Sequence, residues 1–374
     1  MQLPDFALER YFARWEFAVE HLLCASDVEG WRMADLLALA DDETRARWDG
    51  LTLGYTEAPG DPLLRAEIAT LYEGLEADDT LVFSGAEEAI FCLLNTLLRP
   101  GDHAVVTWPG YQSLHEVARA AGAEVTLHEL REDDGWALDV ERLVGSFRPT
   151  TRVAVVNAPH NPTGMLPTPA EWRALGEACR AAGVRLVADE VYRLLEHDGR
   201  APLPAGADLA PTFVSIGVLS KSFALAGLRI GWLASRDRDL LARCAAFKDY
   251  TTICVAGPSE VLGLIALRAS ETVLARSRAI VGPNLERFDT FLAERPGFAS
   301  WVRPAAGSVG FPRLAAALPA DRFAAELVEA TGVLLLPGSA FGHPGNHVRV
   351  GLGRTDFGVA LERLAAFLDG RGIA

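Results

Sequence analysis

The chain has 374 residues, of which half are hydrophobic and 23% are charged, so its composition is that of a globular protein with a large apolar core. The formal net charge of −15, with arginines dispersed among acidic residues, excludes a basic nucleic-acid-binding surface, and no apolar run reaches the roughly 18 residues of a membrane span. The N-terminal residues lack the basic segment and apolar core of a signal peptide, and we expect a cytoplasmic protein without nucleic-acid or membrane partners.

Between residues 80 and 235, short apolar runs alternate with helical patterns. Strands are predicted at 80–84, 103–107, 124–127, 152–156, 184–188 and 212–216, and helices at 87–98, 112–121 and 169–182. Strands separated by helices form βαβ units, so the sequence predicts an α/β fold with a mostly parallel central sheet and helices on both faces.

After residue 235 the pattern changes to long helical stretches and isolated apolar segments. Helices are predicted at 236–247, 261–293 and 357–368, and apolar segments lie at 308–311, 332–336 and 347–350. This composition predicts a smaller α+β domain. We divide the chain into residues 1–45, an N-terminal arm that includes part of the small domain, residues 46–250, the large domain, and residues 251–374, the small C-terminal domain.

Polar residues follow four of the predicted strands. Because ligands of open parallel sheets bind at the carboxyl ends of the strands, these residues are expected to form one site. They are Ser84, Gly85, Ala86 and Glu87 after the first strand, Asn157 to Gly164 after the fourth, Asp189 and Tyr192 after the fifth, and Ser220, Lys221 and Arg229 after the last.

Lys221 is the most informative residue of this set. All but two of the 35 Lys and Arg residues are arginine, and Lys221 lies in an apolar setting between Leu219 and Phe223. A lysine amine can attack a carbonyl, whereas an arginine stays protonated, so Lys221 is a candidate for covalent chemistry. The other lysine, Lys248, is interpreted as incidental.

Several neighbouring features each allow two interpretations. Asp189 ends an apolar run and requires a partner, either a structural ion pair or a ring nitrogen. Arg229, between two apolar residues, is expected to contact a buried anion such as a phosphate. Ser84-Gly85-Ala86 is either a simple helix cap or a phosphate-binding turn, and Asn157–Gly164 is either a plain loop or part of the site.

The motifs together resemble those of fold-type I pyridoxal-phosphate (PLP) enzymes of the class I/II aminotransferase family. They occur in the family's order from Tyr55 to Arg349. The matching segments are Tyr55-Thr56, Ser84-Gly85-Ala86-Glu87, Trp108-Pro109-Gly110-Tyr111, Asn157 to Gly164, Asp189-Glu190-Val191-Tyr192, Ser220-Lys221, Gly227 to Gly231 and His347-Val348-Arg349.

The resemblance implies a role for each matching residue. Lys221 would form a Schiff base with PLP and carry the proton between substrate and cofactor. Asp189 would pair with the pyridine nitrogen, Asn161 and Tyr192 with the ring oxygen, and Tyr111 would stack on the ring. Gly85, Ala86, Glu87, Ser220 and Arg229 would hold the phosphate. Arg349 would bind the substrate α-carboxylate, assisted by Asn161.

The resemblance also implies the partners and the reaction. Tyr55 would reach the cofactor of a neighbouring subunit, so a homodimer with composite active sites is expected. The implied reaction moves an amino group between an L-amino acid and a 2-oxo acid. One residue departs from the family pattern: Val218 stands three positions before the lysine, where many members have a hydroxyl that binds the phosphate.

Two other functions remain open at this point. The Gly217-Val218-Leu219-Ser220-Lys221 segment and the 247–252 segment also resemble capreomycidine synthase-like enzymes, so a PLP-dependent lyase, cyclase or oxidative reaction is the alternative. An aminotransferase-like effector domain of a transcription regulator is disfavoured, because no basic recognition helix precedes Tyr55.

The first forty residues carry a weaker signal. Phe6, Tyr11, Phe12, Trp15 and Phe17 are expected in the core or in dimer contacts. Two acidic residues, Asp27 and Glu29, belong either to a solvated loop or to a substrate entrance that favours a cationic substrate. Five cysteines without a CxxC pair predict neither a disulfide framework nor a metal site.

Overall fold

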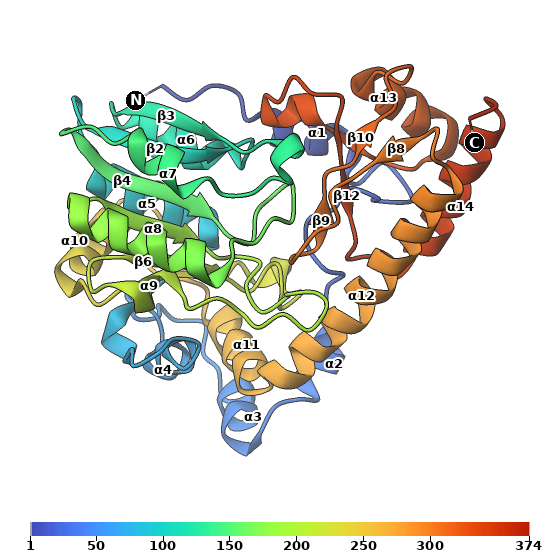
Figure 1. Ribbon diagram of the computed structural model, residues 1–374. Helices are drawn as coiled ribbons and strands as arrows, with labels where there is room; N and C mark the ends of the chain where they lie inside the picture. Colours follow the sequence, from blue (N-terminus) through green and yellow to red (C-terminus); the bar gives the residue numbers. More distant parts are fainter. Residues whose placement is uncertain (1, 374) are drawn as a thin grey trace.

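A computed structural model describes residues 2–373 and divides into a large sheet-containing part and a smaller C-terminal part (Figure 1). The sheet contains β1 (Thr80–Phe83), β2 (His103–Trp108), β3 (Glu124–Glu129), β4 (Thr151–Asn157), β5 (Arg185–Asp189), β6 (Val214–Val218) and β7 (Gly231–Ala234). Its strand order is β1-β7-β6-β5-β4-β2-β3. The strands pair in parallel except β7, which is antiparallel to both β1 and β6.

The six predicted strands are all present, which confirms the α/β fold with a mostly parallel sheet. The seventh strand, β7, was missed: its apolar run is short, begins at a glycine and directly follows Arg229-Ile230. Gly231 is required at its start, since a Cβ there would lie 2.5 Å from the backbone nitrogen of Ala86. This close approach brings β7 against the segment that follows β1.

Helices cover both faces of the sheet. They are α4 (Pro62–Ala69), α5 (Ala86–Leu97), α6 (Gln112–Ala120), α7 (Val140–Gly145), α8 (Pro169–Ala182), α9 (Gly206–Leu209), α10 (Arg238–Lys248) and α11 (Gly257–Arg268). Leu93 of α5 and Leu114 of α6 belong to the hydrophobic cluster on one face, and Trp172 and Leu175 of α8 belong to the cluster on the other. Each face thus buries its own apolar layer, as expected for a parallel sheet.

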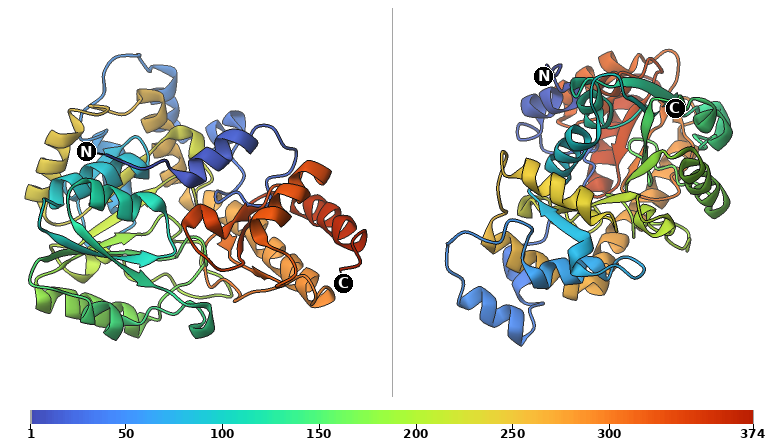
Figure 2. Two further views of the ribbon diagram at one scale, coloured as in Figure 1. Left: turned by 90° about the horizontal axis from the view of Figure 1, so that it is seen from above. Right: turned by 90° about the vertical axis from the view of Figure 1, so that its left-hand side faces the viewer.

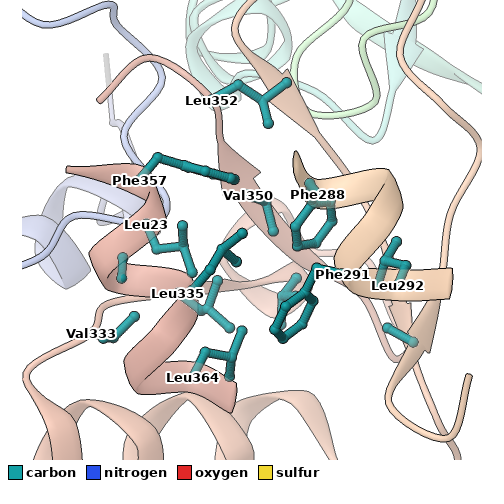
Figure 3. Packing of buried hydrophobic residues seen from close by; sticks show 14 of the residues in the cluster. Leu23, Phe288, Phe291, Leu292, Val333, Leu335, Val350, Leu352, Phe357 and Leu364 are labelled. Carbon is teal, nitrogen blue, oxygen red and sulfur yellow. The ribbon is translucent and has the colours of Figure 1, made fainter. Parts of the chain in front are cut away.

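The smaller part is built around a long helix and a second core. Its elements are α12 (Ser270–Glu294), β8 (Ala299–Ser300), β9 (Val309–Gly310), β10 (Arg313–Leu314), α13 (Ala320–Thr331), β11 (Leu336–Pro337), β12 (Val348–Gly351) and α14 (Phe357–Asp369). Figure 3 shows this core, where Phe288 and Phe291 of α12 pack near Val350 and Leu364. Leu23, from the N-terminal arm, belongs to the same cluster.

The N-terminal arm contributes to both parts. It contains α1 (Ala7–Trp15), α2 (Met33–Leu37) and α3 (Asp42–Asp49). Helix α1 lies between the sheet and the C-terminal part (Figure 2), where the Tyr11 hydroxyl donates to the Leu335 carbonyl at 2.7 Å. Phe17 is 97% exposed and therefore does not belong to the core, so a dimer contact stays the prediction for this residue.

The predicted helical stretch 261–293 is two helices, which separate at Ala269. Helix α11 shares a hydrophobic cluster with α4 and β7 through Leu64, Trp232 and Leu264, so it packs on the sheet-containing part. The domain limits at residues 45 and 250 stay predictions, and this packing favours a later end of the large domain, within α12. Across residues 2–373, no helix is both long enough and apolar enough to cross a membrane.

Candidate active site

One cavity of about 370 Å³ opens at the carboxyl edge of the sheet and collects most of the predicted residues. The strand register aligns Asn157 at the end of β4 with Asp189 at the end of β5, and Asp189 with Ile216 in β6. The predicted residues that line the cavity are Ala86, Glu87, Tyr111, Asn161, Asp189, Tyr192, Ser220, Lys221, Arg229 and Arg349. Tyr55 and Gly85 do not line it.

Lys221 follows β6 by three residues and projects its amine into the cavity. The Nζ donates a hydrogen bond to the Ser26 hydroxyl at 2.9 Å and lies 5.9 Å from the centre of the Tyr192 ring. The side chain is half-buried rather than enclosed. Sequence reasoning missed Ser26, because its contact with Lys221 joins residues that are 195 positions apart.

Asp189 is 3% exposed and holds a carboxylate at the floor of the cavity. Burial raises its pKa to about 7, opposed by a hydrogen bond from the Val191 backbone N–H and by the charge of Lys221. Within residues 2–373 it has no salt-bridge partner. A buried carboxylate without a cation fits a ligand that brings its own positive charge, such as a protonated ring nitrogen.

The raised pKa of Asp189 predicts how the stability of the apoprotein depends on pH. In the Asp189→Asn variant no buried charge forms, so the variant should be more stable than the wild-type apoprotein. The difference between their free energies of unfolding should increase between about pH 4 and pH 7. As pH rises, the Asp189 carboxyl ionises in the unfolded protein at a lower pH than in the folded protein. The wild-type protein therefore loses stability across this pH range. We expect this difference in free energy of unfolding to increase by at least about 1 kcal/mol, since one pKa unit corresponds to ~1.4 kcal/mol.

Urea denaturation of both apoproteins at pH 4.5, 6 and 8 measures this difference. The Asn side chain keeps the acceptor for the Val191 N–H, so the comparison isolates the charge. A difference that does not change with pH would contradict the assigned environment of Asp189.

The opposite end of the cavity is suited to a phosphate. Helix α5 begins at Ala86, after Gly85 with a φ of 87°, and a Cβ on Gly85 would lie 2.4 Å from Nη2 of Arg229. The free N–H groups and dipole of a helix start attract anions. The buried hydroxyl of Ser220 has no hydrogen-bond partner among the described residues. Val218 lines the cavity with an apolar side chain, so the departure from the family pattern removes one hydroxyl there.

Arg229, which is predicted to contact a buried anion, has an exposed side chain. It lines the cavity from a left-handed backbone conformation, with a φ of 53°. Its Nη1 donates to the Ala226 carbonyl at 3.2 Å, and among the described residues it forms no ion pair. Its guanidinium is therefore available to an anion that enters the cavity.

Arg349 on β12 is the most deeply buried cation of the site, with 1% of its surface exposed. Its Nε donates to the Cys24 carbonyl at 3.0 Å, and its Nη1 donates to Oδ1 of Asn161 at 3.2 Å. The Nη2 has no partner within the described chain. Two fixed contacts therefore orient the guanidinium and leave one donor for a carboxylate.

The three tyrosines that the sequence assigns to the site occupy different environments. Tyr111 lines the cavity and packs against Phe6, with 5.2 Å between ring centres. Tyr192 is buried, and its hydroxyl has no partner among the described residues. Tyr55 is 94% exposed and lies outside this cavity, so it does not serve the site of its own chain. Glu87 accepts a hydrogen bond from Ser113 beside Tyr111, and burial raises its pKa.

The N-terminal arm forms a wall of the cavity that the sequence did not predict in detail. Leu8, Glu9, Phe12, Glu16, Ser26 and Asp27 line this wall. Asp27 lies there as one interpretation expected, but Arg354 binds it with two contacts of 3.0 and 3.3 Å. Glu29 does not line the cavity and accepts hydrogen bonds from Thr355. The helical spacing of Leu8, Phe12 and Glu16 is the signal that could have identified this wall.

The cavity fits the PLP that the resemblance implies. The Tyr192 hydroxyl, the Ser220 hydroxyl and Nη2 of Arg349 are buried polar groups without partners in residues 2–373, and they require a polar ligand. The carboxylate of Asp189 and the cation of Arg229 are suited to the charged ring nitrogen and to the phosphate. Among the described residues, no group of three His, Cys, Asp or Glu side chains could hold a metal ion.

Comparisons with known proteins agree with this geometry. The profile of the family described as "Aminotransferase class I and II" matches residues 22–364. Arginine–pyruvate transaminase of Pseudomonas aeruginosa is 31% identical over 91% of this chain and 90% of that protein. Capreomycidine synthase of Streptomyces vinaceus is 29% identical over 93% of this chain and 89% of that protein. A PLP-dependent aminotransferase from Streptococcus suis has a TM-score of 0.93 at 30% identity, covering 100% of this chain and 99% of that chain. The chain therefore belongs to the class I and II aminotransferase family, whose cofactor is pyridoxal 5′-phosphate.

Proposed function

We propose that the protein is a PLP-dependent aminotransferase that moves an amino group from an L-amino acid to a 2-oxo acid. The observation that carries this proposal is the presence of the Lys221 amine, the Asp189 carboxylate and the Arg349 guanidinium around one cavity. These three groups supply a base, a ring partner and a carboxylate-binding donor, which together suit chemistry at the Cα of an amino acid.

Each residue has a distinct task in this proposal. Bound PLP supplies an aldehyde for the substrate amine and a ring that accepts the negative charge left at Cα. Asp189 holds the proton on the ring nitrogen, and Arg349 holds the substrate α-carboxylate, which fixes the Cα–H bond relative to Lys221. The Lys221 amine would take up the Cα proton as general base and, as general acid, would return it to the carbon of the cofactor's aldehyde group.

The phosphate is assigned to groups at the start of α5 and at Ser220. Gly85 admits the Arg229 guanidinium beside the helix start, and Ala86 and Glu87, in the first turn of α5, line the cavity with N–H groups that can bind an anion. Asn161 and Tyr192 are assigned to the ring oxygen, and Tyr111 to the ring face. Asn161 has its carbonyl oxygen engaged by Arg349, so its NH₂ group remains as the donor.

The active site is proposed to be composite, in a homodimer. Leu53, Tyr55, Tyr250 and Ile253 are exposed apolar or aromatic residues in the segments that flank α4 and α10. A surface of this kind is typical of a protein–protein interface. Tyr55 lies outside the cavity of its own chain, so we assign it to the phosphate of the cofactor that is bound in the partner subunit.

A Tyr55→Phe variant tests this assignment. We expect the Kd for PLP to rise by about 10-fold, since a hydrogen bond to a charged group is lost, while the dimer persists. Fluorescence titration of the apoprotein gives the Kd, and light scattering gives the subunit number. A monomeric wild-type protein, or a variant with unchanged PLP affinity, would refute the composite site.

A lyase or cyclase reaction is the second candidate, favoured by the 29% identity to capreomycidine synthase over 93% of the chain. This reaction would use the same Lys221 base and the same Asp189 partner. It would differ from transamination only in the steps that follow removal of the Cα proton. The two candidates differ in their need for a 2-oxo acid, because only transamination consumes one in equal amount to the amino acid.

The deciding experiment incubates the PLP-loaded protein with a panel of L-amino acids, with and without pyruvate or 2-oxoglutarate. Transamination predicts a new 2-oxo acid and a new amino acid in a 1:1 ratio, both measured by mass spectrometry. Ammonia release or a cyclic product without consumption of the added oxo acid would replace the aminotransferase proposal with the second candidate.

A further inference from the structure

We propose that this site takes an L-amino acid whose side chain carries a positive charge, and that Glu16 is the residue that binds this charge. The inference rests on the proposed function, because it assigns the other charged groups of the cavity to the cofactor and to the α-carboxylate. Two independent observations carry it: an unpartnered buried cation donor, Nη2 of Arg349, and the carboxylates of Glu9 and Glu16, which line the same cavity from the N-terminal arm.

Together, these two features favour a ligand that carries both a negative and a positive charge. Nη2 of Arg349, on a side chain that is 1% exposed, lacks an acceptor within the described chain and requires an anion. Glu9 and Glu16 line the same cavity and have no ion-pair or hydrogen-bond partner for their carboxylates among residues 2–373. A ligand with a carboxylate at one end and a cation at the other satisfies both the Arg349 donor and the carboxylates.

The other charges of the cavity are already engaged. Lys221 and Asp189 serve the cofactor ring, and Arg229 serves the phosphate. Asp27 is bound by Arg354, so its charge is largely compensated. Among the described residues, the carboxylates of Glu16 and Glu9 are left without a hydrogen-bond or ion-pair partner, and both line the cavity.

Glu16 is the stronger of these two candidates because it is half-buried, whereas Glu9 is exposed. Burial, followed by the nearby charges of Asp27 and Glu9, raises the pKa of Glu16, and the charges of Arg354 and Lys221 oppose this shift. A cation that entered this region would relieve the repulsion among the carboxylates and would favour the ionised form of Glu16. The carboxylates of Glu9, Glu16 and Asp27 thus favour a positive over a negative side chain at this wall.

The surface between the two charged ends is apolar. Leu8, Phe12 and Glu16 follow one another at intervals of four residues, so they project from the same face of the α1 segment into the cavity. The ring of Phe12 lies 5.7 Å from the guanidinium carbon of Arg349. An aliphatic stem can therefore lie along Leu8 and Phe12 while its charged end reaches Glu16, as in arginine or lysine.

The test compares L-arginine with L-citrulline in the PLP-loaded full-length protein. These two amino acids have nearly the same shape, but only arginine carries a side-chain cation. The readout is exchange of the Cα hydrogen for deuterium from D₂O, measured by mass spectrometry. The Cα–H bond breaks, its proton passes to Lys221 and a solvent deuteron returns to Cα, so no acceptor acid is needed. We expect kcat/KM to be at least about 10-fold higher for arginine.

The Glu16→Gln variant identifies the residue. It should lower kcat/KM for arginine by about 10-fold or more and change that for citrulline by less than about twofold. Glu20→Gln is the matched control, because Glu20 is paired with Arg363 on the surface and lies outside the cavity. An equal loss for both substrates, or the same loss in the control, would overturn the role of Glu16.

The outcomes separate this inference from the proposed function. Equal exchange of arginine, citrulline and L-glutamate, with 2-oxo acid formed from each, would overturn the cationic substrate and leave the aminotransferase in place. Selective exchange of arginine without 2-oxo acid formation would support the cationic substrate and overturn the aminotransferase.

Discussion

Replacement of Lys221 by alanine is expected to lower the turnover of every amino acid substrate by about 10⁴-fold or more. The variant loses both the amine that binds the cofactor covalently and the group that moves the Cα proton, and general acid–base catalysis alone contributes roughly 10²–10⁴-fold. The measurement is the rate of 2-oxo acid formation by the PLP-loaded variant under single-turnover conditions. Within residues 2–373 the Lys221 amine forms one hydrogen bond, to the Ser26 hydroxyl, so the fold itself should tolerate the change.

The Lys221→Arg variant is the matched control for charge. It keeps a cation in the cavity but stays protonated at neutral pH, so it should be as inactive as the alanine variant. Circular dichroism and thermal unfolding would show that both variants fold. If borohydride trapped PLP on the same peptide of the alanine variant, the assignment of Lys221 would be wrong.

Replacement of Arg349 by alanine is expected to have the second-largest effect, a fall in kcat/KM of about 10²–10³-fold for α-amino acids. Loss of one partner from a buried charge pair costs roughly 2–5 kcal/mol, and the substrate carboxylate would lose its partner. The loss should be far smaller for a primary amine that has no α-carboxylate, such as agmatine compared with arginine. Steady-state kinetics on this pair of substrates measures the difference.

Arg349 also has a structural task, because it donates to Cys24 and Asn161. Lysine at this position keeps a positive charge but cannot reproduce the planar contacts, so Arg349→Lys should recover only part of the activity. Equal losses for the amine and the amino acid would mean that the variant disturbs the cavity as a whole, and would contradict a carboxylate-binding role.

The sheet was largely predictable because most of its strands are buried on both faces. The run from Val153 to Val156 is fully buried in the structure, and such continuous apolar runs mark parallel strands. The four-residue strand β7 gave no comparable signal. The break between α11 and α12 was also missed, because Arg268-Ala269-Ser270 contains no glycine or proline and the helical pattern continues through it.

The site was predictable where its residues follow strands in a fixed order. Lys221 and Asp189 belong to this class, since the end of each strand leads to the same edge of the sheet. Ser26 and Glu16 reach the cavity through packing of the N-terminal arm against the C-terminal part, and local sequence does not encode that contact. The exposure of Arg229 could not be predicted for a similar reason, since its apolar sequence neighbours do not report the adjacent cavity.

The positions of the two lysines have a practical consequence for chemical labelling. Lys248 is 1% exposed and donates its amine to the Ala58 carbonyl at 2.6 Å, so it is protected from reagents in solution. Lys221 is half-buried and opens only into the cavity. The outer surface therefore offers no lysine to an acylating dye or an amine crosslinker, and arginine carries its positive charge. An amine-directed probe small enough to enter would report on one side chain, and cofactor occupancy would be read as protection of that single position.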